Sequence, residues 1–188
     1  MLDTLITSKT RIKLLLKFFL NSKASSYLRN LENEFGESTN GIRLELNKFE
    51  KAGLLRSRLS GNKKLYTANT DHPLFDDIHN ILLKYIGFDR IIESVISKLG
   101  NVNKMFVVGS FARGVDSKVI DLILVGNDIN REYLARLTAK GEKIIKRKIR
   151  YLVYTPGEFK TAKNAWAEDQ ILLLWTANGG KQGRGSEI

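Results

Sequence analysis

Cysteine is absent from the 188-residue sequence, which excludes disulfides and thiolate metal ligands. Histidine is nearly absent too: His72 and His79 lie seven positions apart, a poor spacing for zinc without cysteine partners. Apolar runs such as LLLKFFL and ILLLW are far shorter than the roughly 20 residues that span a membrane. The first apolar stretch does not have the pattern of a signal peptide, because lysines interrupt it and no small-residue cleavage site follows it. We therefore expect a cytoplasmic protein with no zinc chemistry and no membrane partner.

Positive charge, in contrast, is in excess. The sequence holds 31 Lys and Arg against 20 Asp and Glu, a net charge of +11. The excess is spread evenly, since residues 1–100 carry 16 basic and 11 acidic residues and residues 101–188 carry 15 and 9. A bias of this size and spread favours a polyanionic partner, most simply nucleic acid. The alternative is a charge that serves solubility alone.

Apolar spacing and capping signals in the first part of the chain predict three helices followed by a hairpin. Apolar residues recur at helical spacing over residues 11–20 and again over residues 25–35, where Gly36 ends the pattern. A third helix follows, capped by Ser38 or Thr39 and running into the AGLL stretch. The run RSRLSGNKKLYTAN then has the pattern of two short strands joined by an SGN turn.

Three helices followed by a basic hairpin resemble the winged helix-turn-helix superfamily. The stretch STNGIRLELNKFEKAGLL is similar to its recognition helix, and RSRLSGNKKLYTAN is similar to its wing. The layout is that of the small winged-helix repressors that include metal sensors. The resemblance implies binding to double-stranded DNA, whereas the missing cysteines give no support for metal sensing.

The exposed side of the third helix and the hairpin are the candidate DNA-binding surfaces. With Ile42, Leu46 and Phe49 on the buried side of the helix, its polar residues can meet base edges in a major groove. The hairpin cations suit phosphate contacts, which position a protein without reading sequence. Leu44 also projects outward, toward a partner subunit or a thymine methyl group; a winged helix used only for protein contacts is the alternative. The predicted DNA-binding residues are Thr39, Asn40, Arg43, Asn47 and Lys48 of the helix and Arg56, Arg58, Lys63 and Lys64 of the wing.

A further helix is expected in DHPLFDDIHNILLKYIG, with Pro73 near its first turn. In winged-helix repressors a helix in this place often pairs two subunits, and symmetric DNA sites favour dimers, so we expect a homodimer. The alternative is packing within one chain. The apolar stripe of this helix consists of Leu74, Ile78, Leu82 and Tyr85 or Ile86.

Helices alternate with strands in the second half, which predicts a small α/β domain with a mixed sheet built on KMFVVG, VIDLILVG and KIRYLVYT. Thr155 to Glu158 has the form of a capping box, which would start a last helix around residues 159–167. The stretch ILLLWTA is expected to dock on the sheet. We predict an α+β fold with a winged helix-turn-helix domain and its connecting helix at residues 1–87, the α/β domain at residues 88–178, and a disordered glycine-rich tail at residues 179–188.

The motif GSFARG, followed by IDLILV on the next strand, resembles the nucleotidyltransferase superfamily in its minimal bacterial form. Those domains carry Gly-Ser, a short helix that ends in Arg-Gly, and then Asp-x-Asp. Gly109, Ser110, Arg113 and Gly114 match the first part, which implies that they bind a nucleotide, since a turn without a side chain lets backbone N–H groups approach phosphate. Together with the winged helix, the resemblance covers nearly the whole chain and indicates bacterial regulators that fuse the two domains.

The carboxylates of a nucleotidyltransferase are incomplete here. Such domains hold magnesium and a nucleoside triphosphate with two carboxylates on one strand face and a third on a neighbouring strand. Asp121 stands in the place of the second aspartate, but Val119 occupies the first and KIRYLVYT offers no acid. Asp116, from its loop, is the other weak candidate for a metal ligand. Two alternatives remain for Asp121. It is a residual metal or ribose contact, and the catalytic residue if the enzyme is active. Otherwise it is a structural residue that caps a neighbouring turn or pairs with Arg113.

These patterns predict a DNA-binding transcriptional regulator whose nucleotidyltransferase-like domain has lost catalysis and serves in ligand sensing, dimerisation or partner binding. The alternative is an active nucleotidyltransferase that uses magnesium and a nucleoside triphosphate to modify a nucleic acid or a protein, with the winged helix positioning the substrate. An antitoxin-like partner protein is a third hypothesis. The basic run KGEKIIKRKIR fits either a phosphate site or the solvated face of a helix.

Overall fold

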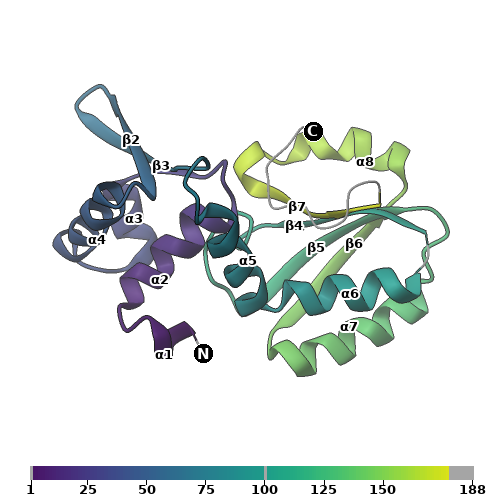
Figure 1. Ribbon diagram of the computed structural model, residues 1–188. Coiled ribbons are helices and arrows are strands. Elements are labelled where there is room, and N and C mark those ends of the chain that lie inside the picture. Colours follow the sequence, from purple (N-terminus) through teal and green to yellow (C-terminus); the bar gives the residue numbers. More distant parts are fainter. Residues whose placement is uncertain (1, 100, 178–188) are drawn as a thin grey trace.

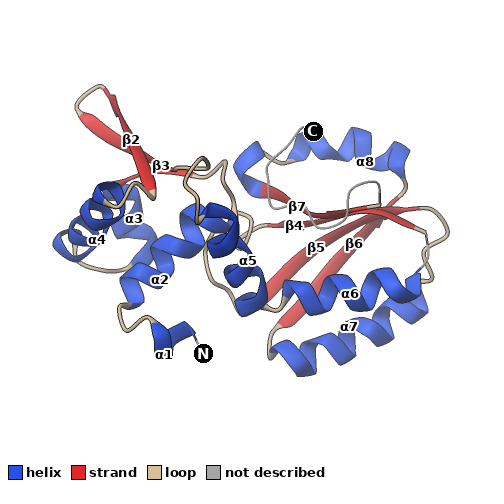
Figure 2. Cartoon of the chain, in the orientation of Figure 1, coloured by secondary structure: helices blue, strands red, loops and turns tan. Residues whose placement is uncertain are grey.

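The computed structural model describes residues 2–99 and 101–177 and has the predicted α+β class. In Figure 1 the N-terminal part, purple to teal, carries helices and a projecting two-stranded wing. The C-terminal part, teal to yellow, is a sheet with helices on both faces, as the colouring in Figure 2 makes plain. None of the helices in residues 2–99 and 101–177 combines the length and hydropathy that crossing a bilayer requires.

The chain begins with two helices that lead into a fully buried π-helix. α1 covers Leu2–Leu5, α2 covers Lys9–Leu15 and the π-helix η1 covers Leu16–Leu20. Every residue from 14 to 20 is buried, Lys17 included, so this stretch is enclosed on all sides rather than amphipathic. The helix expected over residues 11–20 is present, but its second half has the wider i→i+5 geometry of a π-helix.

The prediction of a helix over residues 25–35 is wrong at its start, because the first three residues form a strand. β1 (Ser25–Tyr27) pairs antiparallel with β3, and α3 covers Leu28–Phe35. Serine and tyrosine are poorer helix formers than the leucine and arginine that follow, and the pairing supplies their backbone with hydrogen bonds. Gly36 ends α3 in the left-handed conformation, as predicted.

The third helix and the wing agree with the sequence prediction. α4 covers Thr39–Lys51, and the Ser38 Oγ caps it by accepting a hydrogen bond from the Gly41 N–H at 3.2 Å. β2 (Leu55–Ser60) and β3 (Lys63–Ala68) form the antiparallel wing, and β1 completes a sheet of order β1-β3-β2. α2 and α3 both pack on α4, which gives this half the winged helix-turn-helix layout.

The connecting helix uses its apolar face within the chain. α5 (Phe75–Ile86) begins two residues after Pro73 and packs on η1. Its buried residues are Phe75, His79, Leu82, Leu83 and Ile86. Leu74, expected in the apolar stripe, lies before the helix and is exposed, which corrects that assignment. The face expected to pair two subunits is thus largely covered by the chain itself, and the homodimer stays a prediction.

The second half is a four-stranded mixed sheet with α6 and α7 on one face and α8 on the other (Figure 1). The strand order is β6-β5-β4-β7, with β5 and β6 parallel and the other neighbours antiparallel. The stretch ILLLWTA, which we expected to dock on the sheet, forms its edge strand β7 beside β4. The elements are α6 (Phe88–Leu99), β4 (Val102–Val108), β5 (Val119–Gly126), α7 (Arg131–Ile145), β6 (Lys148–Tyr154), α8 (Pro156–Ala162), the 3-10 turns η2 (Lys163–Ala165) and η3 (Glu168–Gln170), and β7 (Ile171–Thr176).

The C-terminal end of the sheet agrees in part with the prediction. The capping box is confirmed: the Thr155 Oγ1 accepts from the Glu158 N–H, and the Glu158 carboxylate accepts from the Thr155 N–H. The helix that it starts is shorter than expected, because α8 ends at Ala162 and a 3-10 turn follows. The tail expected to be disordered, residues 179–188, lies outside the described residues.

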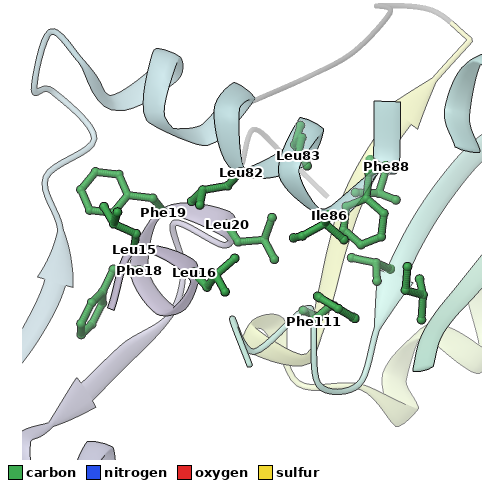
Figure 3. Close-up of a cluster of buried hydrophobic side chains, with 14 of the residues drawn as sticks. Leu15, Leu16, Phe18, Phe19, Leu20, Leu82, Leu83, Ile86, Phe88 and Phe111 are labelled. Atoms are coloured by element: carbon green, nitrogen blue, oxygen red, sulfur yellow. The ribbon is translucent and has the colours of Figure 1, made fainter. Parts of the chain in front are cut away.

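One hydrophobic cluster runs from the first half into the second (Figure 3). Leu16 and Leu20 of η1 meet Ile86 of α5, Phe88 of α6 and Phe111 of the GSFARG turn, each at most 1% exposed. The Phe88 and Phe111 rings lie edge to face, with centroids 5.7 Å apart. The GSFARG turn therefore belongs to the core that joins the two halves, and the division into domains at Gly87 stays a prediction.

Candidate nucleic-acid interface and ligand pocket

A groove of about 700 Å³ lies between α3, α4 and the wing. We call it the wing groove. It carries four cations, Arg29, Arg43, Lys63 and Lys64, and one carboxylate, Glu32, so its lining has a net positive charge. The full lining is Tyr27, Leu28, Arg29, Glu32, Thr39, Arg43, Asn47, Asn62, Lys63, Lys64 and Tyr66.

The structure gathers five of the nine predicted DNA-binding residues in the wing groove. These are Thr39, Arg43, Asn47, Lys63 and Lys64. The other four, Asn40, Lys48, Arg56 and Arg58, are exposed on α4 and β2 outside the groove lining. Leu44 is also exposed, as expected from its place on the helix.

The cations of this surface differ in their partners. Arg43, Arg58 and Lys63 take part in no ion pair within the part of the chain that the structure describes. Three others are paired: Lys48 with Glu45, Arg56 with Asp71 and Lys64 with Glu50, at 3.1, 2.8 and 2.8 Å. A phosphate can engage the first three without breaking an existing ion pair, so they are the readier contacts.

Two groups of contacts hold the groove in shape. The Arg11 guanidinium donates to both carboxylate oxygens of Glu45, at 2.8 and 3.2 Å, which ties α4 to α2 and lowers the pKa of Glu45. On the other side, the Tyr27 hydroxyl lies 3.2 Å from the Ser60 Oγ at the end of β2, and the Lys63 ammonium lies 5.9 Å from the Tyr27 ring centroid. These contacts keep the wing beside β1.

Sequence reasoning missed Tyr27 and Arg29. Both lie in the stretch predicted to be one helix, where no local pattern distinguished groove residues from others. Only the pairing of β1 with β3 brings Tyr27 to the wing. The adjacent aromatic and basic residues in the YLRN run were the one available signal, since aromatic and basic side chains together are common in nucleic-acid sites.

In the second half, the GSFARG motif forms a turn between β4 and β5 rather than the expected short helix. The Gly109 carbonyl oxygen accepts from the Arg113 N–H at 3.3 Å, and the Ser110 carbonyl oxygen accepts from the Val115 N–H at 2.9 Å. Gly109 has φ 71°, and a Cβ there would lie 3.1 Å from the Asp121 Oδ2, so the glycine leaves room for that carboxylate.

The four predicted nucleotide-binding residues of this motif lie on different sides of the turn. Gly109 and Arg113 line a pocket on the α8 side of the sheet, whereas Ser110 and Gly114 do not. Gly114 is buried against η1: a Cβ there would lie 2.3 Å from the Lys17 Cα. Asn21 fixes the same region, since its Nδ2 donates to the Ala112 carbonyl oxygen at 2.8 Å. One side of the turn thus faces the pocket, and the other packs on the first half.

Asp121 is paired with an arginine, but not with the Arg113 named as its partner from sequence. The Arg150 Nε donates to the Asp121 Oδ1 at 2.6 Å, and this bond raises the pKa of the Arg150 guanidinium. The pair follows from the sheet register, in which Asp121 stands opposite Arg150 on parallel strands. Asp121 therefore forms an ion pair, as in the structural alternative, but with Arg150 in place of Arg113.

The surroundings of Asp121 do not fit a magnesium ion. Two positions earlier on the same face of β5 is Val119, and the register places Lys148 opposite Val119. Where magnesium needs several hard oxygen ligands, this strand pair offers one carboxylate and two cations. Within residues 2–99 and 101–177, no three His, Asp or Glu side chains gather in a way that could hold a metal ion.

Asp116, the other candidate for a metal ligand, is also paired with an arginine. The Arg147 Nη1 donates to its Oδ1 at 2.6 Å and to the Ser117 carbonyl oxygen. The Arg147 guanidinium also lies over the Phe111 ring, 5.2 Å from its centroid. The basic run of residues 140–150 is therefore divided: Arg147 and Arg150 hold the two aspartates, Lys148 pairs with Glu142, and Lys140, Lys143 and Lys146 are exposed.

The pocket beside Asp121 has a volume of about 660 Å³. It lies between the GSFARG turn, β6 and the segment after α8. Its charged residues are Arg113, Arg150 and Asp121, and its aromatic residues, Tyr151 and Trp166, are both partly exposed. The full lining is Val108, Gly109, Arg113, Asp121, Leu122, Arg150, Tyr151, Leu152, Ala165, Trp166 and Gln170.

Comparison with known proteins shows only weak likeness. No protein-family model matches the chain, and no curated protein matches it. Among solved structures, a candidate nucleotidyltransferase from Sulfolobus solfataricus is 24% identical over 55% of this chain and 87% of its own, with a TM-score of 0.36. HlyU from Vibrio cholerae, in its reduced form, is 16% identical over 46% of this chain and 84% of its own, with a TM-score of 0.35. At such scores the likeness carries no argument about function.

Proposed function

We propose that this chain is a DNA-binding transcriptional regulator. The observation that carries the proposal is the wing groove, in which Arg43 and Asn47 of α4 lie beside Lys63 and Lys64 of the wing. A helix that presents an arginine and an asparagine can enter a major groove and contact guanine and adenine edges. The adjacent wing cations suit phosphates, and a net charge of +11 favours a polyanionic partner.

In this proposal the second half performs no nucleotidyl transfer. Its one strand carboxylate, Asp121, is engaged by Arg150, and Val119 supplies no metal ligand. We assign this half a role in ligand sensing and in supporting the first half, because the GSFARG turn contacts both the pocket and η1.

We also propose that the regulator acts as a homodimer. Leu74, directly before α5, and Ile81 of α5 are exposed, at 53% and 51%, beside the helix face that packs on η1. Exposed apolar residues on a connecting helix suit a symmetric contact between two copies. Sedimentation velocity with the wild type and with Ile81→Asp tests this: a dimer that becomes a monomer supports it, and a monomeric wild type at tens of micromolar contradicts it.

The DNA-binding proposal is tested by selecting bound duplexes from a random pool and measuring affinity for the enriched sequence. We expect Arg43→Ala to weaken specific binding by about 1–3 kcal/mol and to relax the preference at one base pair. Lys63→Ala should instead weaken binding to all duplexes similarly and lower the slope of log K against log salt by about 1.

Arg136→Ala is the matched control, since Arg136 is an exposed arginine of α7 outside the wing groove. It removes the same charge from the molecule, so a loss equal to that of Arg43→Ala would mean that net charge alone drives binding. A pool that shows no enrichment, or binding that does not depend on salt, would contradict the proposal.

A further inference from the structure

The pocket beside Asp121 is built from groups that suit an organic anion without a metal ion. Its volume of about 660 Å³ lies in the range of small-molecule sites. Two arginines and one aspartate give the lining a net charge of +1, and Arg113 has no ion pair among the residues that the structure describes. Val119 stands in the place of the first metal-binding aspartate, and the sheet register sets Lys148 and Arg150 opposite Val119 and Asp121.

The Asp121–Arg150 pair leaves most of the guanidinium available. Asp121 takes the Nε–H, so the four N–H groups on the two Nη atoms remain, and the Arg150 side chain is 72% exposed. Paired in this way, the guanidinium is held at the pocket edge, where it can donate two parallel hydrogen bonds to a phosphate. Asp121 here acts as a positioning residue for Arg150.

The rest of the lining suits a flat ring. Trp166, which follows the 3-10 turn after α8, is partly exposed and packs against the cluster around Phe106 and Phe159. Its indole can stack on a base, and this interaction does not require one particular base. Gln170 adds an amide that can donate to and accept from a ring edge. Leu152 contributes an exposed apolar side chain beside it.

We infer that this pocket binds a compound with a planar base and one phosphate group, of the nucleoside monophosphate class, and that binding needs no metal ion. Charge complementarity favours one phosphate over three, because a triphosphate brings about four negative charges to a lining of net charge +1. The inference rests on the ligand-sensing role proposed for the second half, whose ligand class it names, and it does not depend on DNA binding.

The test is the thermal unfolding and tryptophan fluorescence of the full chain with each of the four common nucleoside monophosphates, in EDTA and separately in magnesium. We expect at least one monophosphate at millimolar concentration to raise the melting temperature in EDTA and to quench fluorescence. The parent nucleoside and inorganic phosphate should each bind at least tenfold more weakly. In Trp166→Phe the quenching should be lost, because the other tryptophan, Trp175, lies outside the pocket.

Variants at the charged residues separate this inference from a metal site. Arg113→Gln and Arg150→Gln should each weaken monophosphate binding about tenfold or more, whereas Arg136→Gln, at an exposed and paired arginine of α7, should leave it unchanged. Asp121→Asn keeps an oxygen that accepts from Arg150 but removes a negative charge, so it should tighten monophosphate binding roughly threefold. At a magnesium site the same substitution would abolish binding.

Three results would overturn the inference: no response to any monophosphate at millimolar concentration, binding that requires magnesium and is lost in Asp121→Asn, or inorganic phosphate binding as tightly as the monophosphates. Duplex selection on the same protein reports on the wing groove independently. If no monophosphate binds but the protein still selects DNA duplexes, the DNA-binding proposal stands and the ligand-sensing role is refuted for this pocket. If a monophosphate binds but no duplex is selected, the inference about the pocket stands without the DNA-binding proposal.

Discussion

At Gly114 the backbone has φ 73°, and a Cβ built there would lie 2.3 Å from the Lys17 Cα and 2.5 Å from the Leu16 carbonyl oxygen. Gly36 has a similar backbone, φ 63°, but nothing lies within 4 Å of its Cβ position. The two glycines therefore separate two effects of a side chain: the cost of the left-handed conformation, which both share, and the loss of close packing, which affects Gly114 alone.

We predict that Gly114→Ala lowers the free energy of unfolding by about 2–5 kcal/mol, because strain and overpacking add. Gly36→Ala, the control, should cost only about 1–2 kcal/mol. Urea unfolding followed by circular dichroism measures both. Equal losses for the two variants would mean that the turn does not pack on η1 as closely as described.

His79 predicts a pH dependence. It is 3% exposed, and its Nδ1 donates to the Phe19 carbonyl oxygen at 2.8 Å. Burial lowers the pKa of His79, although the hydrogen bond to Phe19 and the charge of Asp76 oppose the shift. The native state then binds a proton less readily than the unfolded state. The stabilisation by neutral His79 is complete above about pH 6.5 and falls as the pH decreases toward the lowered pKa.

Urea unfolding at pH 7.5 and 5.5 should therefore show a larger loss of stability in the wild type than in His79→Gln. His72→Gln is the control, because His72 lies on the loop before α5 and lacks this buried contact. Should His79→Gln lose as much stability as the wild type over this interval, the pH dependence must come from other groups.

At the scale of elements, η1 contacts α3 and α5 as well as the GSFARG turn. The His79 ring of α5 meets its Phe19 carbonyl, the GSFARG turn packs on Leu16 and Lys17, and the Lys17 ammonium donates to Glu34 of α3 at 2.9 Å. The Lys17 side chain is only 10% exposed, so this ion pair is better shielded than the other helix pairs at the surface. The Lys17–Glu34 pair therefore fixes α3 to η1, which belongs to the hydrophobic cluster shared by the two halves.

Glu34→Gln should lower stability by about 1–2 kcal/mol, since it leaves a shielded ammonium without its carboxylate. Glu132→Gln makes the same change in the exposed pair with Arg136 and should cost at most about 0.5 kcal/mol. Chemical unfolding of the two variants side by side decides the matter. A cost for Glu34→Gln as small as the control would show that solvent screens the Lys17–Glu34 pair.

Elements with local signals could be predicted from the sequence. The cap at Ser38, the turn of the wing and the capping box at Thr155 each depend on a few neighbouring residues, and all three are present. β1 could not be predicted in this way, because residues 25–27 are extended only through pairing with residues 65–67. The π-helix was missed for a similar reason, since its burial on all sides comes from α5 and the second half.

The same distinction between local signals and long-range pairing applies to the candidate sites. The period of two along β5 placed Val119 and Asp121 on one face, so the missing carboxylate was visible in the sequence. The partner of Asp121 could not be predicted from the sequence, because the register of two parallel strands places Arg150, and not Arg113, beside it. Nor does the motif distinguish Gly109, which leaves room for a carboxylate, from Gly114, which packs on another part of the chain.

At the scale of the whole molecule, the continuous cluster of Figure 3 predicts that the chain unfolds as one unit. Both tryptophans, Trp166 and Trp175, lie in the second half, so their fluorescence reports on that half alone, whereas circular dichroism reports on both. We expect the two urea transitions to coincide in the wild type. A fluorescence transition that clearly precedes or follows the other would mean that the halves unfold separately.

The contact between η1 and the GSFARG turn also bears on how such chains can recombine. A hybrid gene joined at Gly87 would couple Leu16, Leu20 and Ile86 to a foreign second half that need not offer the equivalents of Phe111 and Gly114. Asn21 would likewise lose the Ala112 carbonyl. The smallest exchangeable piece of this protein is then not a domain, because residues 16–21 and the turn at residues 109–114 must be inherited together.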